Sequence, residues 1–171
     1  RGVCRRATFG KRERGGRGRS VVLLVDVSSS GRFGSRRKTK SEVAAEVAAL
    51  LAYTAIKSND KVGLIVFSDE VELYIPPKKG RGHVWRVIRE ILTHHPRRKG
   101  TDIEAALDYL GRVIRRRAVV FLLSDFLDAT FEERLRLAAR RHGLTAVAVT
   151  GPRESEFQTI RPPALLVSRP D

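Results

Sequence analysis

The sequence has 171 residues, 42% of them hydrophobic, which is sufficient for one domain with a core of its own. No apolar run approaches the roughly 18 residues that a transmembrane helix needs, so the sequence excludes a membrane span within this chain. The single cysteine, Cys4, excludes an internal disulfide and has no Cys or His neighbour at a zinc-ligand spacing. We therefore expect a reducing, cytoplasmic setting.

Charge distinguishes the first residues from the rest. The formal net charge is +15, and nearly half of this excess lies in residues 1–19, where eight Arg and Lys side chains accompany one acidic residue, Glu13. We expect this Gly- and Arg-rich leader to be flexible. Such a charge makes nucleic acid, anionic lipid or an acidic protein the candidate partner. Because the chain starts at Arg1 and contains no methionine, we expect it to be a segment of a longer protein.

The first predicted strand follows this leader. Its apolar residues, Val21–Val25, form an unbroken β-branched and leucine run that ends at Asp26, as expected for a strand buried on both faces. A Ser-, Gly- and Arg-rich loop extends to about Lys40. Apolar residues then recur at helical spacing until the polar residues that start at Ser58, which predicts a helix between these two points.

A hairpin and a second helix are expected next. Residues 62–67 form an apolar strand, and the alternation in residues 71–75 predicts a half-exposed strand that pairs with it. We expect Pro76 and Pro77 to end this second strand. The apolar residues of 84–92 then recur at helical spacing, and this helix should end before Pro96.

The second half of the chain continues the alternation of helices and strands. We predict a helix over 103–114, an apolar strand over 118–124, a helix over 130–142 ended by Gly143, and a strand over 144–150. This order predicts an α/β fold: a doubly wound, mostly parallel sheet with one antiparallel edge hairpin and helices on both faces. We assign residues 20–151 to the domain and residues 152–171 to a C-terminal extension, in which 164–168 resembles a further edge strand.

Polar residues gather where the predicted strands end. Asp26, Ser28 and Ser30 follow the first strand, Thr101 precedes a helix, and Asp125 ends the strand of residues 118–124. Open parallel sheets bind ligands outside the carboxyl ends of their strands, so we expect these five residues to converge. Two carboxylates and three hydroxyls make an all-oxygen site, which favours Mg²⁺, with Mn²⁺ and Ca²⁺ as alternatives, over zinc or copper.

The charges around this site suggest its partner. An ion held by only two protein carboxylates is suited to accept a third carboxylate from outside. Basic runs at residues 36–38 and 97–99 should flank the site, where they would attract an acidic partner and accelerate its approach. We therefore expect a non-enzymatic module that recognises an acidic protein.

The order Asp26-Val27-Ser28-Ser29-Ser30, then Thr101, then Asp125 resembles the DxSxS…T…D metal-ion-dependent adhesion site of von Willebrand factor A domains. Over about residues 19–155 the chain is similar to bacterial DUF58 proteins, in segments 59–68, 100–102, 123–126 and 151–154. The resemblance implies that Ser28, Ser30 and Thr101 bind the ion directly and that Asp26 and Asp125 act mainly through water. It further implies a MoxR-type AAA+ ATPase as the partner and a parent protein anchored in a membrane through segments not present here.

Each candidate residue also has a simpler interpretation. Thr101 and Glu104 have the spacing of a capping box, so Thr101 could serve only to bind free amides at a helix start. Thr130 and Glu133 share this spacing, and we assign them the capping role alone. Serines in a loop and an aspartate at a strand end are common turn formers. It is the joint placement of the five residues that favours a metal site over these readings.

Two other functions compete with the interaction module. The positive charge favours nucleic-acid binding through the basic leader and surface, although aromatic residues are only 6% and no recognised nucleic-acid motif is present. A weaker alternative is a metal-dependent hydrolase with Asp26 as nucleophile, which lacks a candidate general base. We assign no metal-binding role to the four histidines, since none has a ligand spacing and His94 and His95 lie at a helix end.

Overall fold

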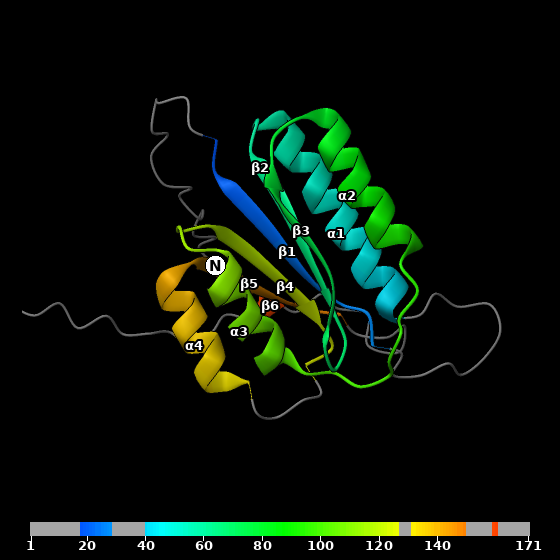
Figure 1. Ribbon diagram of the computed structural model, residues 1–171, viewed down its shortest axis with the longest axis vertical. Helices are drawn as coiled ribbons and strands as arrows, with labels where there is room; N and C mark the ends of the chain where they lie inside the picture. The colour runs from blue at the N-terminus through cyan, green and yellow to red at the C-terminus, as the bar shows by residue number, and fades with distance from the viewer. Residues whose placement is uncertain (1–17, 29–39, 127–130, 150–158, 161–171) are drawn as a thin grey trace, which may run out of the picture.

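The computed structural model describes residues 18–28, 40–126, 131–149 and 159–160, and Figure 1 shows their arrangement. The described part forms one sheet of six strands in the order β3-β2-β1-β4-β5-β6. The strands are β1 (Ser20–Asp26), β2 (Lys61–Phe67), β3 (Val71–Lys78), β4 (Val119–Ser124), β5 (Gly143–Ala148) and β6 (Thr159–Ile160), and the helices are α1 (Lys40–Lys57), α2 (Arg81–Thr93), α3 (Ile103–Val113) and α4 (Glu132–Arg141).

The centre of the sheet is parallel and fully buried. β1 pairs in parallel with β2 and β4, and β4 pairs in parallel with β5. Residues 22–25 of β1 are completely inaccessible to solvent, in agreement with the unbroken apolar run of the sequence. The predicted doubly wound, mostly parallel fold is confirmed.

Two helices cover each face of the sheet. Helices α1 and α2 lie side by side over one face, and small buried residues of α1, Ala44, Ala48 and Ala52, let it approach the strands closely (Figure 1). Helices α3 and α4 cover the other face through the apolar stripe that contains Ile103, Leu110 and Leu135. Both core layers are therefore formed by the residues whose helical spacing is visible in the sequence.

The edge strand β3 is longer than the sequence suggested. We expected Pro76 and Pro77 to end it, but β3 continues to Lys78, which pairs with Val62. Proline is tolerated in an edge strand because one side of that strand needs no hydrogen-bond donor. A Cβ on Gly63 would lie 2.8 Å from the Pro77 ring, so the glycine makes room for the proline where the register shifts.

The end of the chain adds a second antiparallel edge. β6 pairs with β5 through Ala146 and Ile160, so a part of the segment assigned to the C-terminal extension belongs to the sheet. The predicted strand at 164–168 and the leader at 1–17 lie outside the described residues, as does Thr130. Helix α4 starts after Phe131, whose side chain makes no capping bond, and Gly143 already belongs to β5 rather than ending the helix in a left-handed turn.

The described helices differ from membrane spans in length or polarity. None of those within the described ranges is both long enough and apolar enough to cross a bilayer.

Candidate metal centre

The carboxyl ends of β1 and β4 and the start of α3 lie together at one edge of the sheet, which we call the rim. β1 lies between β2 and β4 and is parallel to both. Asp26, the last residue of β1, pairs with Phe67 of β2, and the residue before it, Val25, pairs with Leu123 of β4. Parallel strands that end together bring their following residues to one place. This register explains how residues separated by more than seventy positions come to share a site.

Asp26 is the buried carboxylate of the rim, with 5% of its surface exposed. Its Oδ1 accepts a hydrogen bond from the backbone N–H of Ser28 at 2.9 Å, and its Oδ2 accepts one from the hydroxyl of Ser124 at 2.6 Å. Burial raises the pKa of Asp26, the hydrogen bonds from Ser124 and Ser28 oppose this, and the charge of Asp125 raises the pKa further. A cation near Asp26 would favour its ionised form.

Ser28 and Thr101 connect the first strand to the third helix. The Thr101 hydroxyl donates a hydrogen bond to the Ser28 hydroxyl oxygen at 2.6 Å. Two oxygens bound as neighbours to one octahedral Mg²⁺, each at about 2.0–2.1 Å, lie about 2.9 Å apart, so this pair is placed closely enough to share an ion.

The capping-box interpretation of Thr101 is wrong. The N-cap of α3 is Asp102, whose Oδ1 accepts a hydrogen bond from the Ala105 N–H at 2.8 Å. The Asp102 N–H in turn donates to the carbonyl of Ser68 at 2.8 Å, which fixes the start of the helix to the end of β2. Because Asp102 caps the helix, the hydroxyl of Thr101 is available to the rim.

Asp125 follows β4 directly and is partly exposed. It lies near enough to Asp26 for its charge to raise the pKa of that residue. The next residue, Phe126, has a φ of 54°, a left-handed conformation that a bulky side chain rarely adopts, and its N–H donates to the Ser124 hydroxyl at 3.2 Å. This turn holds Asp125 at the rim. The fifth predicted ligand, Ser30, lies outside the described residues.

Ser124 belongs to the site, although it is not among the five residues predicted from the sequence. It is buried at the end of an otherwise apolar strand and donates to Asp26 while accepting from Phe126. The signal was its position: a serine inside an apolar strand needs a polar partner, and the nearest candidate was the aspartate that ends the neighbouring strand.

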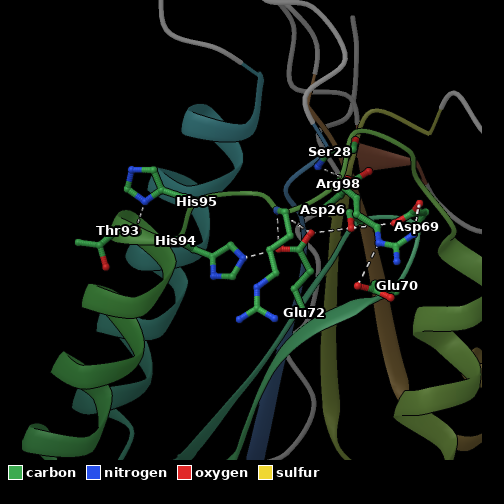
Figure 2. Close-up of polar contacts among 11 residues, drawn as sticks. Asp26, Ser28, Asp69, Glu70, Glu72, Thr93, His94, His95 and Arg98 are labelled. Atoms are coloured by element: carbon green, nitrogen blue, oxygen red, sulfur yellow. Dashed lines mark hydrogen bonds and ion pairs between the residues drawn. The ribbon is translucent and has the colours of Figure 1, made fainter.

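A second polar cluster supports the loop that leads to Thr101 (Figure 2). Glu72 of β3 accepts hydrogen bonds from the Ser68 hydroxyl at 2.7 Å, from His94 Nε2 at 2.7 Å and from the Arg97 N–H at 3.1 Å. The side chain of Glu72 is completely buried. The cluster thus fastens the end of α2 and the following basic loop to the β2–β3 turn.

Part of the basic charge expected beside the site is neutralised. Arg98 forms ion pairs with Glu70 at 3.2 Å and with Asp69 at 3.6 Å, both in the β2–β3 turn (Figure 2). Gly100 lies close to the same turn, since a Cβ on it would come within 3.2 Å of the Asp69 Cβ. Arg98 therefore helps to hold this loop in place, whereas Arg97 and Lys99 are exposed to solvent.

The donor set of the rim matches a hard cation. In the part of the chain that the structure describes, no three or more His, Cys, Asp or Glu residues gather in a way that could hold a metal. Any ion at the rim would therefore depend on hydroxyls in addition to the two carboxylates, a donor set that suits Mg²⁺, Mn²⁺ or Ca²⁺.

The histidines have other contacts: His83 with the Val62 carbonyl, His94 with Glu72, His95 with the Thr93 carbonyl and His142 with the Ala118 N–H.

Comparison with known proteins identifies relatives over most of the chain. The model of the family described as "Protein of unknown function DUF58" matches residues 5–162. The uncharacterized protein Rv1480 of Mycobacterium tuberculosis is 30% identical over 141 residues, which are 81% of this chain and 44% of that protein. An uncharacterized protein of Mycobacterium avium, MAV169, is 33% identical over 89 residues, or 50% of this chain and 53% of that protein. The chain thus spans about half the length of these relatives.

Solved structures share the fold. The conserved hypothetical protein BatB from Bacteroides thetaiotaomicron superposes with a TM-score of 0.60 at 17% identity, covering 82% of this chain and 75% of BatB. Proximal thread matrix protein 1 from the mussel byssus, in a structure with a zinc-occupied MIDAS motif, gives a TM-score of 0.56 at 18% identity and covers 77% of this chain and 37% of that protein. The fold is therefore of the von Willebrand factor A type.

Proposed function

The chain belongs to the DUF58 family, and from this premise we propose that it is a non-enzymatic interaction module that binds a divalent cation at the rim and recognises an acidic protein partner. The observation that carries the proposal is the direct contact between the hydroxyls of Ser28 and Thr101 beside the buried carboxylate of Asp26. Three segments of the chain contribute to one oxygen-lined site. A fold of the von Willebrand factor A type supports this use of the strand ends.

The roles of the residues follow from their surroundings. Ser28 and Thr101 are suited to bind the ion directly, because their hydroxyl oxygens face each other and are neutral. Asp26 has both oxygens engaged by Ser28 and Ser124, which suits a carboxylate that orients the hydroxyls or bound water. Asp125 supplies the second negative charge, and Ser30 is proposed as the third hydroxyl. When bound, the ion would supply an electrophilic position for a carboxylate.

Mg²⁺ is the proposed ion, with Mn²⁺ and Ca²⁺ as alternatives. The protein from the mussel byssus supports a divalent cation in a fold of this type, since its MIDAS motif is described as occupied by zinc. In this chain the oxygen donors favour a harder ion.

An acidic partner is proposed from the charges near the rim. Arg97 and Lys99 are exposed in the loop that Glu72 anchors, and Arg98 is half exposed beside its two carboxylate partners. These cations would favour a partner that presents a carboxylate to the ion. The DUF58 resemblance makes a MoxR-type AAA+ ATPase the proposed partner.

Catalysis is disfavoured by the bonding of Asp26. A nucleophilic carboxylate needs a free oxygen directed at the substrate, whereas both oxygens of Asp26 accept short hydrogen bonds inside the protein. The metal-dependent hydrolase is accordingly the weaker alternative.

Nucleic-acid binding is the second candidate, and exposed cations at the opposite end of the sheet favour it. Arg115, Arg116, Arg117 and Arg140 are exposed near the end of α3 and α4, and none of the four forms an ion pair within the described ranges. Removal of residues 1–19 should abolish DNA affinity and its salt dependence if the basic leader carries this function, whereas affinity retained by the shortened chain would assign it to these arginines.

Calorimetric titration with MgCl₂ tests the proposed site. The wild-type chain is expected to bind one ion with an affinity that Asp26→Ala and Thr101→Val both abolish. Thr145→Val, a threonine of β5 away from the rim, is the matched control and should bind as the wild type does. Equal heats from all four proteins would refute the site.

A pull-down with and without EDTA then tests the partner. A partner protein that stays bound after EDTA removes the cation would show that the ion is not the contact.

A further inference from the structure

The exposed large hydrophobic residues of the described part are concentrated on one helix pair. Leu50 and Tyr53 of α1 are 63% and 45% exposed, and Trp85 and Leu92 of α2 are 56% and 53% exposed. Only Leu137 of α4, among the described residues of this kind, lies elsewhere. Single exposed residues of this kind are common, whereas several gathered on one face are typical of an interaction surface.

These four side chains lie on the outward side of the two helices, and we call this surface the α1–α2 face. The Tyr53 and Trp85 rings have centroids 6.3 Å apart and join the two helices. Leu50 lies one turn before Tyr53, and Leu92 lies two turns after Trp85 on the same side of its helix. Figure 1 shows α1 and α2 side by side along one flank of the sheet.

Cations lie beside and between these apolar residues. Arg81 and Arg89 lie four residues before and after Trp85, and Lys57 lies four residues after Tyr53, so each shares the side of its helix with an aromatic residue. All three are exposed, and Arg89 contacts a carboxylate, Glu90, only at 3.9 Å. The face thus combines aromatic rings, leucines and exposed positive charge.

We propose that the α1–α2 face binds the surface of a bilayer that contains anionic phospholipid. Tryptophan and tyrosine favour the headgroup region, leucine side chains enter the acyl boundary, and Arg and Lys are attracted to the phosphates. Nucleic acid would use the rings and cations but would leave the exposed leucines without a function, because bases stack on aromatic residues. A second copy of this chain would bring two charges of +15 together.

This surface is separate from the proposed metal site. Its residues lie on the outward side of helices that cover one face of the sheet, whereas the rim lies at the carboxyl ends of the strands. Bilayer binding and cation binding can therefore succeed or fail independently, and Asp26→Ala should leave the first unchanged.

The chain has one tryptophan, Trp85, so its fluorescence reports on this face directly. The 171-residue chain is titrated with vesicles of phosphatidylcholine alone or mixed with phosphatidylglycerol. We expect emission to move to shorter wavelength with the anionic vesicles only, as the ring leaves water. Leu50→Ser is expected to weaken partitioning several-fold, and Leu137→Ser, at a leucine that is 49% exposed on the other side of the sheet, should bind as the wild type does.

Charge-reversal variants show whether bilayer binding depends on cations of the α1–α2 face or only on the net charge of the chain. Arg81→Glu with Arg89→Glu should lower partitioning into the anionic vesicles at least about tenfold, whereas Arg116→Glu with Arg140→Glu, the same change in charge at another edge, should lower it much less. Vesicle binding without a shift in Trp85 emission would overturn the proposal, because the leader would then carry the attraction. An equal shift with single-stranded DNA, or a concentration-dependent shift without vesicles, would also overturn it by assigning the face to nucleic acid or to a second copy.

Discussion

Ser28 and Thr101 are 73 positions apart in the sequence, yet the hydroxyl of Thr101 donates to that of Ser28 at 2.6 Å. The contact joins the loop after β1 to the start of α3, two segments that are separated in the sequence by the β2–β3 hairpin. The two hydroxyl oxygens are therefore close enough to bind one ion together.

Thr101→Val should abolish Mg²⁺ affinity with little effect on stability. Valine keeps the shape of threonine but lacks the hydroxyl, and the cap of α3 is retained because Asp102 provides it. We expect the free energy of unfolding in the absence of metal to change by less than about 1 kcal/mol, the value of one hydrogen bond. Calorimetry and urea unfolding measure the two effects on the same protein.

Asp102→Ala is the complementary variant. It removes the N-cap bond to Ala105 and should destabilise the protein by about 0.5–2 kcal/mol, while leaving Mg²⁺ bound once the protein is folded. If Thr101→Val destabilised the chain as much as Asp102→Ala does and still bound Mg²⁺, Thr101 would be a structural residue of the helix start and its assignment to the metal site would be wrong.

Glu72→Gln should loosen the loop that carries Thr101. Burial raises the pKa of Glu72, but hydrogen bonds from Ser68, His94 and Arg97 outweigh it, so the pKa lies below its usual value and the residue is ionised at neutral pH. Loss of this charge from a buried, fully bonded position should cost about 1–3 kcal/mol of unfolding free energy. Hydrogen exchange of the Arg97 amide, which donates to Glu72, should accelerate as well.

Glu70→Gln is the matched control for this effect. Glu70 lies two residues away and pairs with Arg98, but half of its side chain is exposed. An exposed ion pair contributes about 0–1 kcal/mol, so this variant should unfold nearly as the wild type does. Similar losses from both variants would mean that the turn as a whole, rather than the buried cluster around Glu72, holds the loop.

Asp26→Asn should abolish the effect of Mg²⁺ on thermal stability. In wild type the buried carboxylate close to Asp125 opposes folding, and a bound cation should relieve this cost and raise Tm. Asparagine keeps the shape and removes the charge, so the variant should melt at or above the wild-type temperature in EDTA and gain nothing from MgCl₂. An equal rise of Tm in both proteins would place the cation elsewhere.

The order of the elements was predictable because each strand of the parallel sheet is an unbroken apolar run. Val21–Val25 has this form since both of its faces are covered, and the aspartate at its end marks the place where the strand leaves the core. Five candidate ligands were found by asking which polar residues lie at the carboxyl ends of the predicted strands. For Asp26, Ser28 and Thr101 the structure provides the contacts.

What the sequence did not reveal depends on partners far along the chain. Ser124 bonds to Asp26 across 98 positions, and Glu72 bonds to His94 across 22, so neither pairing has a local signal. The continuation of β3 through Pro77 depends on space above Gly63 in the neighbouring strand. Local rules describe an isolated segment, and they fail where another strand or helix supplies the missing partner or the missing room.

His142 should make stability depend on pH below neutrality. It is 1% exposed, its Nδ1 accepts from the Ala118 N–H at 3.3 Å, and its Nε2 has no hydrogen-bond partner within the described residues. Burial lowers the pKa of His142 below its ordinary value of 6.5, and the charges of Arg141 and Arg117 lower it further. The folded protein therefore keeps this imidazole neutral at a pH where the unfolded chain would protonate it.

The sign of the effect follows from proton binding. Well above pH 6.5 His142 is neutral in both the folded and the unfolded protein, so it adds no pH dependence to stability. As pH falls below 6.5, the unfolded chain gains a proton that the folded protein excludes. Stability therefore decreases until the pH reaches the pKa of His142 in the folded protein. His142→Asn, whose side-chain oxygen can replace Nδ1 as the acceptor for Ala118, should reduce the slope of unfolding free energy between pH 7 and 5 by up to about 1.4 kcal/mol per pH unit. His95→Asn, at an exposed helix end, is the control and should keep the wild-type slope. An unchanged slope in His142→Asn would mean that this imidazole binds its proton equally well in the folded and the unfolded protein.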